Sequence, residues 1–369
     1  MALIALHSVK QRGFSLIEVM ASMTIGLVIL MAVVSMLVTA TRSQKDLGDS
    51  SQLIENGNYS INTLYDNLRL AGYYGHYFNS ISPPATLPDP CLVTASDLQA
   101  AMALPVQGYE ATSLTTRANV TATTCYTSNL LGNNNVKPGS DILVVRRAAT
   151  NILTGTPINN QMYLQSNVVT AAIQVGSSSA NVPTTTADNG TVTIQKRNGA
   201  TVLPADTRAF HVTVYFVAPC SVAKASTGIC STGDDTIPTL KRLELSVNGG
   251  VTAMVITPLA EGVEYLKFLY GVDTTTTTDP STGLVGDGLP DDYIPASSVT
   301  QWNTVMSVQI YLLVRSSMPT SGFTDDKTYT LGNTTIAPTD ITTAELSYKR
   351  HAFSSEVRLI NLAGPRSTL

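Results

Sequence analysis

The feature that most constrains this chain is an apolar run of 22 residues, Val19 to Ala40, close to its N-terminus. As an α-helix such a run is about 33 Å long, which matches the hydrocarbon core of a bilayer. Lys10 and Arg12 precede the run, so the positive-inside rule predicts a cytoplasmic N-terminus with the bulk of the chain across the membrane. The run is longer than an ordinary signal peptide allows, and no A-x-A pattern closes it. The sequence therefore predicts a transmembrane helix over about 19–40.

One residue is out of place in a simple anchor. Glu18 stands at the start of the apolar run, and a carboxylate in a transmembrane helix costs about 2.5–3.5 kcal/mol at its centre and less near its edge. One interpretation is that Glu18 only counters the dipole of its own helix. The other is that it has a partner elsewhere.

The residues around Glu18 carry a resemblance. The stretch RGFSLIEVM, residues 12–20, resembles the N-terminal signal of type IV prepilins and pseudopilins, with Glu18 as the fifth residue counted from Phe14. The resemblance implies that residues 1–13 are a leader, which a prepilin peptidase removes between Gly13 and Phe14, and that the Phe14 amine is then N-methylated. It also implies that the apolar helix is a membrane anchor first and part of a filament core later.

Physical chemistry agrees with a charge pair at Glu18. Cleavage creates an α-amino group, which is cationic near or below pH 7.7–8.0. A carboxylate at position five can neutralise that amine, in its own chain or in a neighbouring subunit, and in an apolar filament core a pair is favoured over two isolated charges.

The helix is predicted to continue beyond the membrane. Leu47, Ile54, Ile61 and Leu68 recur every seven residues among charged neighbours, which is typical of an amphipathic helix. Glycines in RLAGYYG end it, so residues 14–75 form one helical segment.

The remainder, 76–369, is predicted to be one β-rich head, with a possible inserted subdomain at about 83–205. Strands are expected to begin near Asp141, Thr191, Ala209, Leu240, Val251, Gly262, Val305 and His351. A Gly-Gly hairpin turn is expected at Asn248–Gly250. The fold class is α+β, a long N-terminal helix of the pilin type followed by a large β-rich domain.

A second resemblance covers the helix and the C-terminal third. The segments LAEGVEYLKFLYGVD, DDYIPASSVTQWNTVMSVQIYLLVRS and YKRHAFSSEVRLIN look like the PilW family of minor pilins, and NLRLAGYYG fits the same family. It implies a minor pilin that primes assembly of a type IV pilus and lies at or near its tip. The implied partners are other minor pilins, the major pilin, the prepilin peptidase, the inner-membrane assembly platform and a PilY-type tip adhesin. The implied location is the inner membrane with a periplasmic head, and the extracellular pilus tip after assembly.

Two alternatives remain open: a type II secretion pseudopilin, and a membrane-anchored periplasmic binding protein or enzyme. No nucleic-acid partner is predicted, because the net charge is −4. No catalytic motif is found, and His7, His76, His211 and His351 have no partner at ligand spacing. We therefore predict no enzymatic activity and no catalytic residues.

Four cysteines, Cys91, Cys125, Cys220 and Cys230, lie beyond the membrane segment and allow three disulfide connectivities. We favour Cys91–Cys125 and Cys220–Cys230, because partners nearer in sequence meet most easily; four buried free thiols are the alternative.

A last candidate is a loop rich in aspartate. Asp273, Asp279, Asp287, Asp291 and Asp292 lie on a glycine-bearing stretch whose oxygens could bind Ca²⁺, although the spacing does not fit an EF-hand. A solvated acidic loop is the simpler interpretation. No other cofactor is expected.

Overall fold

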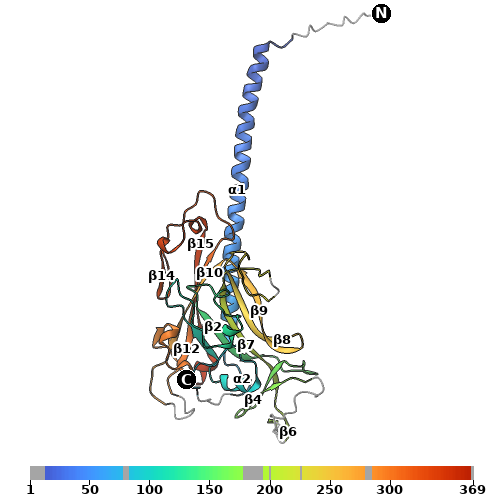
Figure 1. Cartoon of the computed structure of the whole chain (residues 1–369), viewed down its shortest axis with the longest axis vertical. Helices are drawn as coiled ribbons and strands as arrows, with labels where there is room; N and C mark the ends of the chain where they lie inside the picture. Colours follow the sequence, from blue (N-terminus) through green and yellow to red (C-terminus); the bar gives the residue numbers. More distant parts are fainter. Residues whose placement is uncertain are drawn as a thin grey trace, which may run out of the picture. The chain divides into compact units, whose positions relative to one another are not determined.

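A helix of 54 residues, α1 (Leu16–Arg69), opens the described part of the chain (Figure 1). The computed structural model describes residues 13–77, 83–177, 194–198, 201–224, 227–278 and 285–366. The chain divides into two compact units, one ending at Ser51 and the other beginning at Gln52. The division falls inside α1, so the helix contributes its apolar half to the first unit and its amphipathic half to the second.

In the second unit α1 buries one narrow face. Its buried residues are Leu53, Gly57, Ser60, Leu64, Asn67 and Leu68. The predicted seven-residue stripe is correct at Leu68 and partly correct at Ile61, but wrong at Leu47 and Ile54, which are 71% and 48% exposed. A strict seven-residue spacing drifts by about 20° per repeat around a straight helix, so the buried face moves away from such a stripe.

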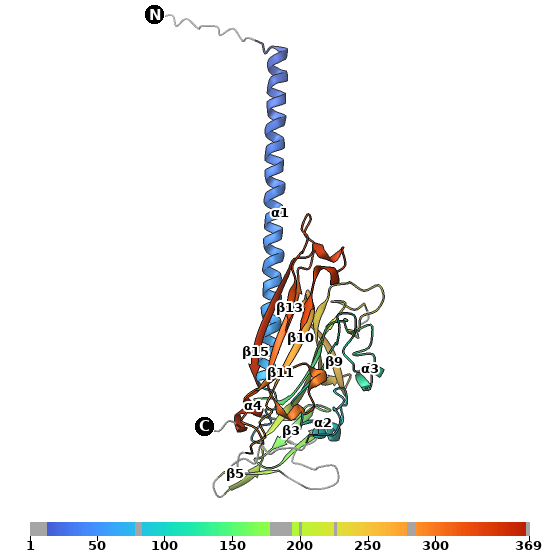
Figure 2. The same ribbon diagram turned by 90° about the vertical axis from the view of Figure 1, so that its left-hand side faces the viewer.

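Small residues on that face allow a strand to approach closely. A Cβ atom at Gly57 would lie 2.2 Å from Cε2 of Phe353, a residue of β15 (Arg350–Arg358), and Figure 2 shows this strand beside α1. Amide side chains add specific bonds: Asn56 donates to the carbonyl of Glu261 at 3.0 Å, and Asn67 donates to Tyr215 Oη at 2.6 Å. The helix therefore docks through shape and directed hydrogen bonds as well as through apolar contacts.

Seven antiparallel strands form the larger sheet. They are β1 (Val106–Tyr109), β2 (Ile142–Ala148), β3 (Met162–Ser166), β4 (Ala171–Val175), β7 (Thr207–Ala218), β8 (Thr239–Asn248) and β9 (Val251–Glu261). The long strand β7 is central, since it pairs with β2, β3 and β8 along different parts of its length. The predicted Gly-Gly turn joins β8 to β9, with Gly249 and Gly250 at φ values of 58° and 79°.

Four further antiparallel strands form the smaller sheet in the order β11–β10–β12–β15. They are β11 (Asp292–Ile294), β10 (Val263–Val272), β12 (Val305–Arg315) and β15. Two small hairpins pair β13 (Tyr329–Leu331) with β14 (Thr334–Ile336), and β5 (Gln195–Asn198) with β6 (Thr201–Pro204). Short helices are α2 (Ala95–Ala101), α3 (Thr124–Thr127), α4 (Ile360–Ala363), η1 (Ala296–Ser298), η2 (Trp302–Thr304), η3 (Pro338–Asp340), η4 (Glu345–Ser347) and η5 (Gly364–Arg366).

Each of the eight predicted strands has a counterpart in the structure, namely β2, β5, β7, β8, β9, β10, β12 and β15. Strands β1, β3, β4, β6, β11, β13 and β14 were not predicted; each is five residues or fewer and too short to show a clear alternation. In the stretch considered as an inserted subdomain, 83–205, strands β1 to β4 are part of the same sheet as β7.

Two apolar cores lie on opposite faces of the larger sheet. One joins that sheet to the smaller sheet and to α1 through residues such as Leu64, Tyr215 and Ile310. The other packs under α2 and includes Phe216 and all four half-cystines, Cys91 at its partly buried edge. A third, smaller core lies under the β13–β14 hairpin.

A buried ion pair links the two sheets directly. Lys267 of β10 donates to Asp141 at 2.7 Å, and both side chains are 3% exposed. The same carboxylate accepts from the backbone amides of Ala111 and Phe268 at 2.9 and 3.0 Å. Burial raises the pKa of Asp141 to about 6, although Lys267 and the two amides pull it down. Asp141 therefore depends on these partners to carry a charge inside the head.

We predict that Lys267→Met destabilises the protein by about 3–5 kcal/mol at pH 8, because it leaves a buried carboxylate without its counter-charge. Loss of the ammonium raises the pKa of Asp141 further, so the folded variant takes up a proton where the unfolded chain does not. Its deficit against the wild type should therefore shrink as the pH falls from 8 to 5.5. Urea denaturation at the two pH values measures both effects.

The exposed Lys327 supplies the matched control, since Lys327→Met removes the same charge from the surface and should change stability by about 0.5 kcal/mol or less. Equal stability of the Lys267→Met and Lys327→Met variants at pH 8 would contradict the assigned role.

Candidate functional site

The residues of the proposed processing site lie at the start of α1. Gly13 and Phe14 precede the helix, and Phe14 is 87% exposed. Glu18, in the first turn, accepts a hydrogen bond from the backbone amide of Ser15 at 3.0 Å. This is the backward half of a capping box, so Glu18 caps its own helix in this chain. The amide that it binds belongs to the residue directly after Phe14, which places the carboxylate near the position where cleavage would create an amine.

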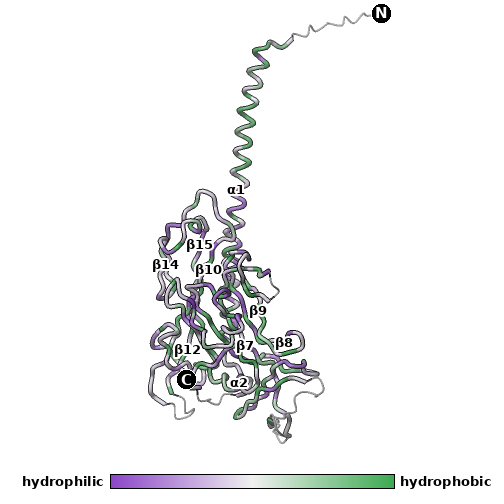
Figure 3. Tube along the Cα trace, in the orientation of Figure 1, coloured by the Kyte–Doolittle hydropathy of each residue, from purple (hydrophilic) through white to green (hydrophobic). Residues whose placement is uncertain are grey.

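The apolar half of α1 is long and apolar enough to span a membrane, and the most apolar stretch of it makes no buried contact in the described chain (Figure 3). Its hydroxyl groups bond back to carbonyls of the same helix, over distances of 2.8–2.9 Å; they belong to Ser22, Thr24, Ser35, Thr39 and Thr41. Bonded in this way, the hydroxyls need no partner from their surroundings.

The EGVE motif and the basic final strand, two features of the family resemblance, meet in the structure. Arg350 of β15 donates to Glu264 of β10 at 2.6 Å and to Asp325 at 3.3 Å. Burial alone would lower the pKa of Arg350, but Glu264 and Asp325 raise it above its usual value. All three side chains are buried, so this charged cluster holds the smaller sheet together.

Backbone geometry also explains why the second position of the EGVE motif is a glycine. Gly262 has a φ of +82°, and a Cβ atom there would lie 2.4 Å from the carbonyl oxygen of Arg315. The backbone of Arg315 in turn donates to Gly262 at 2.8 Å. Only glycine fits this tight passage from β9 to β10, which explains the motif by backbone geometry.

The structure joins the cysteines in the pairing that the sequence favoured, Cys91 to Cys125 and Cys220 to Cys230. Among the described residues, Asp89, Cys91 and Cys125 are the only acidic, histidine or cysteine side chains grouped closely enough to share a metal ion. Both sulfurs of that group are used in the disulfide, and Asp89 accepts from the amides of Cys91 and Thr124. The disulfide and the hydrogen bonds of Asp89 together fix the conformation of this loop.

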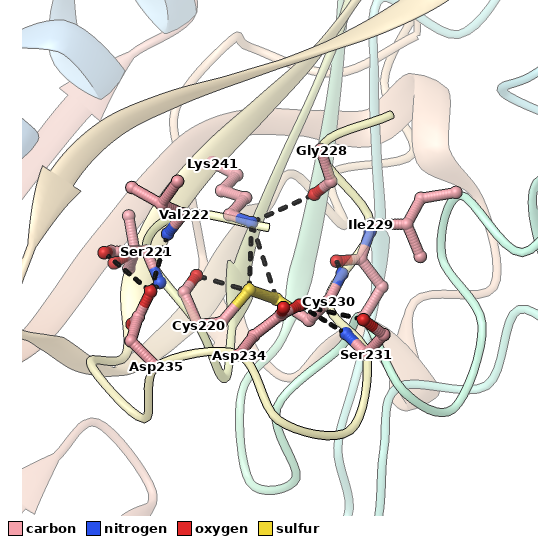
Figure 4. The surroundings of a disulfide bond; sticks show 12 residues. Cys220, Ser221, Val222, Gly228, Ile229, Cys230, Ser231, Asp234, Asp235 and Lys241 are labelled. Carbon is pink, nitrogen blue, oxygen red and sulfur yellow. Dashed lines mark hydrogen bonds between the residues drawn. A yellow bond between two sulfur atoms is a disulfide. The ribbon is translucent and has the colours of Figure 1, made fainter. Parts of the chain in front are cut away.

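The second disulfide has an unexpected neighbour, Lys241 of β8 (Figure 4). Its ammonium group lies 3.6 Å from the sulfur of Cys220 and 3.5 Å from that of Cys230, and it donates to the carbonyl of Gly228 at 3.0 Å. Burial lowers the pKa of Lys241, and the carboxylates of Asp235 and Asp234 oppose this effect. This cation could not be recognised from the sequence, because it lies on a strand whose pattern indicated only an ordinary core strand.

Asp235 fixes the ends of the loop that this disulfide closes. Asp235 accepts from the amides of Ser221, Val222 and Ile237 at 2.8–3.0 Å. Burial raises the pKa of Asp235, but these hydrogen bonds lower it by more, so its pKa lies below the usual value. The loop is thus held by a covalent bond and by charge-assisted hydrogen bonds.

The aspartates considered for calcium have separate partners in the structure. Asp273 accepts from the amides of Thr275 and Gly288, and Asp291 accepts from the amide and hydroxyl of Thr274. Asp287 and Asp292 accept from the amides of Leu289 and Tyr293, respectively. Asp279 lies outside the described residues. Within the described part of this loop, no three carboxylates lie close enough together to share one ion.

Three of the four histidines lie in the described chain. His76 is 3.7 Å from Asp206 and His211 is 3.6 Å from Glu244, while His351 meets the ring of Phe353 edge-on. His7 lies outside the described residues. The three sites come from different strands and loops, and the structure does not gather them into one centre.

Two family models match parts of this chain. Residues 220–361 match the family model for Type IV Pilus-assembly protein W, and residues 9–34 match that for the prokaryotic N-terminal methylation motif. Among solved structures, a type IV-like pilin from Thermus thermophilus is 17% identical over 41% of this chain and 78% of its own, with a TM-score of 0.16. No curated protein matches.

The N-terminal motif, the long apolar helix and the sheet-rich head resemble those of type IV pilin-like proteins. The match over residues 220–361 confirms the resemblance to the PilW family of pilus-assembly proteins. The two matches point to a structural protein, and the motif and the apolar helix support anchoring in a membrane.

We predict that loss of the Cys91–Cys125 disulfide costs more stability than loss of Cys220–Cys230, because it closes 34 residues of chain rather than 10. The chain-entropy relation gives about 4 and about 3 kcal/mol, respectively. Denaturation of the two double Cys→Ala variants without reductant measures the difference. Under full reduction the wild type and both variants should converge, and a reversed order without reductant would contradict the estimate.

Proposed function

We propose that this chain is a minor pilin that helps to prime assembly of a type IV pilus and lies at or near its tip. The observation that carries the proposal is the presence, on one chain, of a methylation motif at residues 9–34 and a PilW-type region at 220–361. The methylation motif is typical of helices that enter a filament, and the PilW-type region is typical of proteins that assemble a pilus.

Entry into the filament depends on the N-terminus in this proposal. A prepilin peptidase cuts between Gly13 and Phe14, and the new Phe14 amine is methylated. Glu18, which caps its own helix in the uncut chain, then pairs with an amine of its own or of a neighbouring subunit. Until assembly, the apolar half of α1 holds the protein in the inner membrane with its head in the periplasm.

The head supports a place at the tip. It belongs to the compact unit that begins at Gln52, and repeating so large a domain along a helical filament is sterically difficult. A tip subunit meets this obstacle once. Partners there would be other minor pilins, the first major pilin subunits and a PilY-type adhesin, with the assembly platform below.

The residues that make the PilW resemblance recognisable support a structural role. Glu264, Arg350 and Gly262 hold strands together through an ion pair and a close backbone contact. Partner selection would then reside on the head surface, and no cofactor is needed.

A type II secretion pseudopilin is the second candidate, because the methylation motif does not distinguish the two systems. The PilW match favours the pilus. A membrane-anchored binding protein or enzyme is the third, and it requires an uncut N-terminus.

We predict that Glu18→Ala leaves membrane insertion intact and lowers the number of surface pili at least tenfold, because an unpaired amine would be carried into an apolar core. Pili are counted by electron microscopy and the protein is quantified in membrane fractions. Glu55→Ala, at an exposed position on α1, should leave piliation unchanged. Normal piliation in the Glu18→Ala strain would exclude the charge-pair role.

Mass spectrometry of the native protein supplies an independent test. We predict that the mature chain begins at N-methylated Phe14 and contains both disulfides. A native chain that still begins before Gly13 would contradict the filament role and favour the anchored binding protein.

A further inference from the structure

A groove of about 490 Å³ lies beside β1, between this strand and the segment that contains η1 and η2. Its apolar lining includes Leu104, Val299 and Trp302, which are 2%, 9% and 5% exposed. Nothing described above uses this groove.

One wall of the groove is an open strand edge. β1 is at the end of the larger sheet and pairs only with β2. The amide of Arg146 donates to the carbonyl of Pro105, which sets the alternation of the ladder: Gln107 and Tyr109 face β2, whereas the N–H and C=O groups of Val106 and Gly108 point away from it. Among the described residues these groups have no partner.

The open edge is unusual because it is buried. Val106 is 1% exposed, and Gly108, which lines the groove, is buried as well. Buried backbone groups are almost always paired. Val106 does not line the groove, so the edge reaches the groove at Gly108, whose unpaired N–H and C=O groups can bind another backbone there.

A buried hydroxyl beside this wall also lacks a partner. Tyr270 is 1% exposed and its Oη makes no hydrogen bond within the described residues. A Cβ atom at position 108 would lie 2.0 Å from this Oη and 3.0 Å from the ring of Trp302. Gly108 therefore has to be glycine for Tyr270 and Trp302, which pack edge to face at 4.8 Å, to lie against the strand.

The charge of the groove is set by one residue. Glu110 is the only charged residue that lines the groove. Its Oε2 accepts hydrogen bonds from the amide and the hydroxyl of Ser297. The second carboxylate oxygen has no partner in the described chain. A ligand that fills the groove would therefore be complementary if it carried a cation at this end.

We propose that the groove binds an extended peptide segment of a partner protein, which adds as a strand to β1 and places a lysine or arginine beside Glu110. Backbone pairing to Gly108 and the apolar lining would supply the binding, and Glu110 would supply the selectivity. That the partner is a pilus component rests on the proposed function; the binding itself does not.

The sequence contains a single tryptophan, so Trp302 fluorescence reports occupancy of the groove in the full chain in detergent micelles. The probes are three synthetic hexapeptides. The first is acetyl-Thr-Val-Thr-Lys-Val-Thr-amide, the second has Glu in place of Lys, and the third is the Lys peptide with N-methyl groups on alternate backbone amides.

We expect the Lys peptide to change Trp302 emission saturably, and to slow hydrogen exchange at the amide of Gly108. The Glu peptide should bind about tenfold more weakly because it meets Glu110. The N-methylated peptide should not bind, because it cannot pair with a strand edge.

Glu110→Gln should weaken the Lys peptide about fivefold and remove the preference for Lys over Glu. Glu261→Gln, which removes the same charge from β9 away from the groove lining, is the matched control and should change neither value.

The proposal is overturned if the Lys peptide changes neither signal at millimolar concentration, if the N-methylated peptide binds equally well, or if Glu110→Gln keeps the preference. None of these results bears on N-terminal processing, so the groove and the filament role can fail separately.

Discussion

The contact between Lys267 and Asp141 is the interaction on which the head depends most. Asp141 directly precedes β2, and Lys267 lies in the middle of β10. Their contact therefore fixes the smaller sheet against the larger one. Tyr270 of β10 lies against Gly108 of β1. β12 pairs with β10, and β15 pairs with β12. Phe353 on β15 then meets Gly57 on α1. A single buried charge pair thus positions the floor of the groove and the surface on which the helix docks.

Much of this fold could be predicted from the sequence where long patterns are present. The apolar run, the glycine stop of α1 and the eight strands rest on periodicity that extends over many residues. The helix stripe failed at Ile54 because packing on Gly57 and Ser60 selects a face by closeness of approach, which hydrophobicity does not record. Short edge strands such as β1 and β11 were missed because three or four residues hold no usable period.

The candidate site divides in the same way. Gly13, Phe14 and Glu18 could be proposed from sequence because processing motifs are local, and the cysteines could be paired by proximity. Lys241 beside the Cys220–Cys230 bond, Glu264 against Arg350 and the groove beside β1 could not, since each unites residues that only the sheet topology brings together. The loop aspartates show the converse: residues close in sequence bind separate backbone amides.

The back-bonded hydroxyls of α1 have a consequence for transfer between environments. A helix whose serine and threonine groups bind its own carbonyls presents the same closed surface to acyl chains and to apolar protein. Moving that surface from one to the other breaks no hydrogen bond and exposes no new polar atom. For α1, transfer from a bilayer into a filament would then be close to an exchange between two equivalent apolar environments. Glu18 would be the group whose environment differs between them, because its carboxylate could gain an amine partner in the filament.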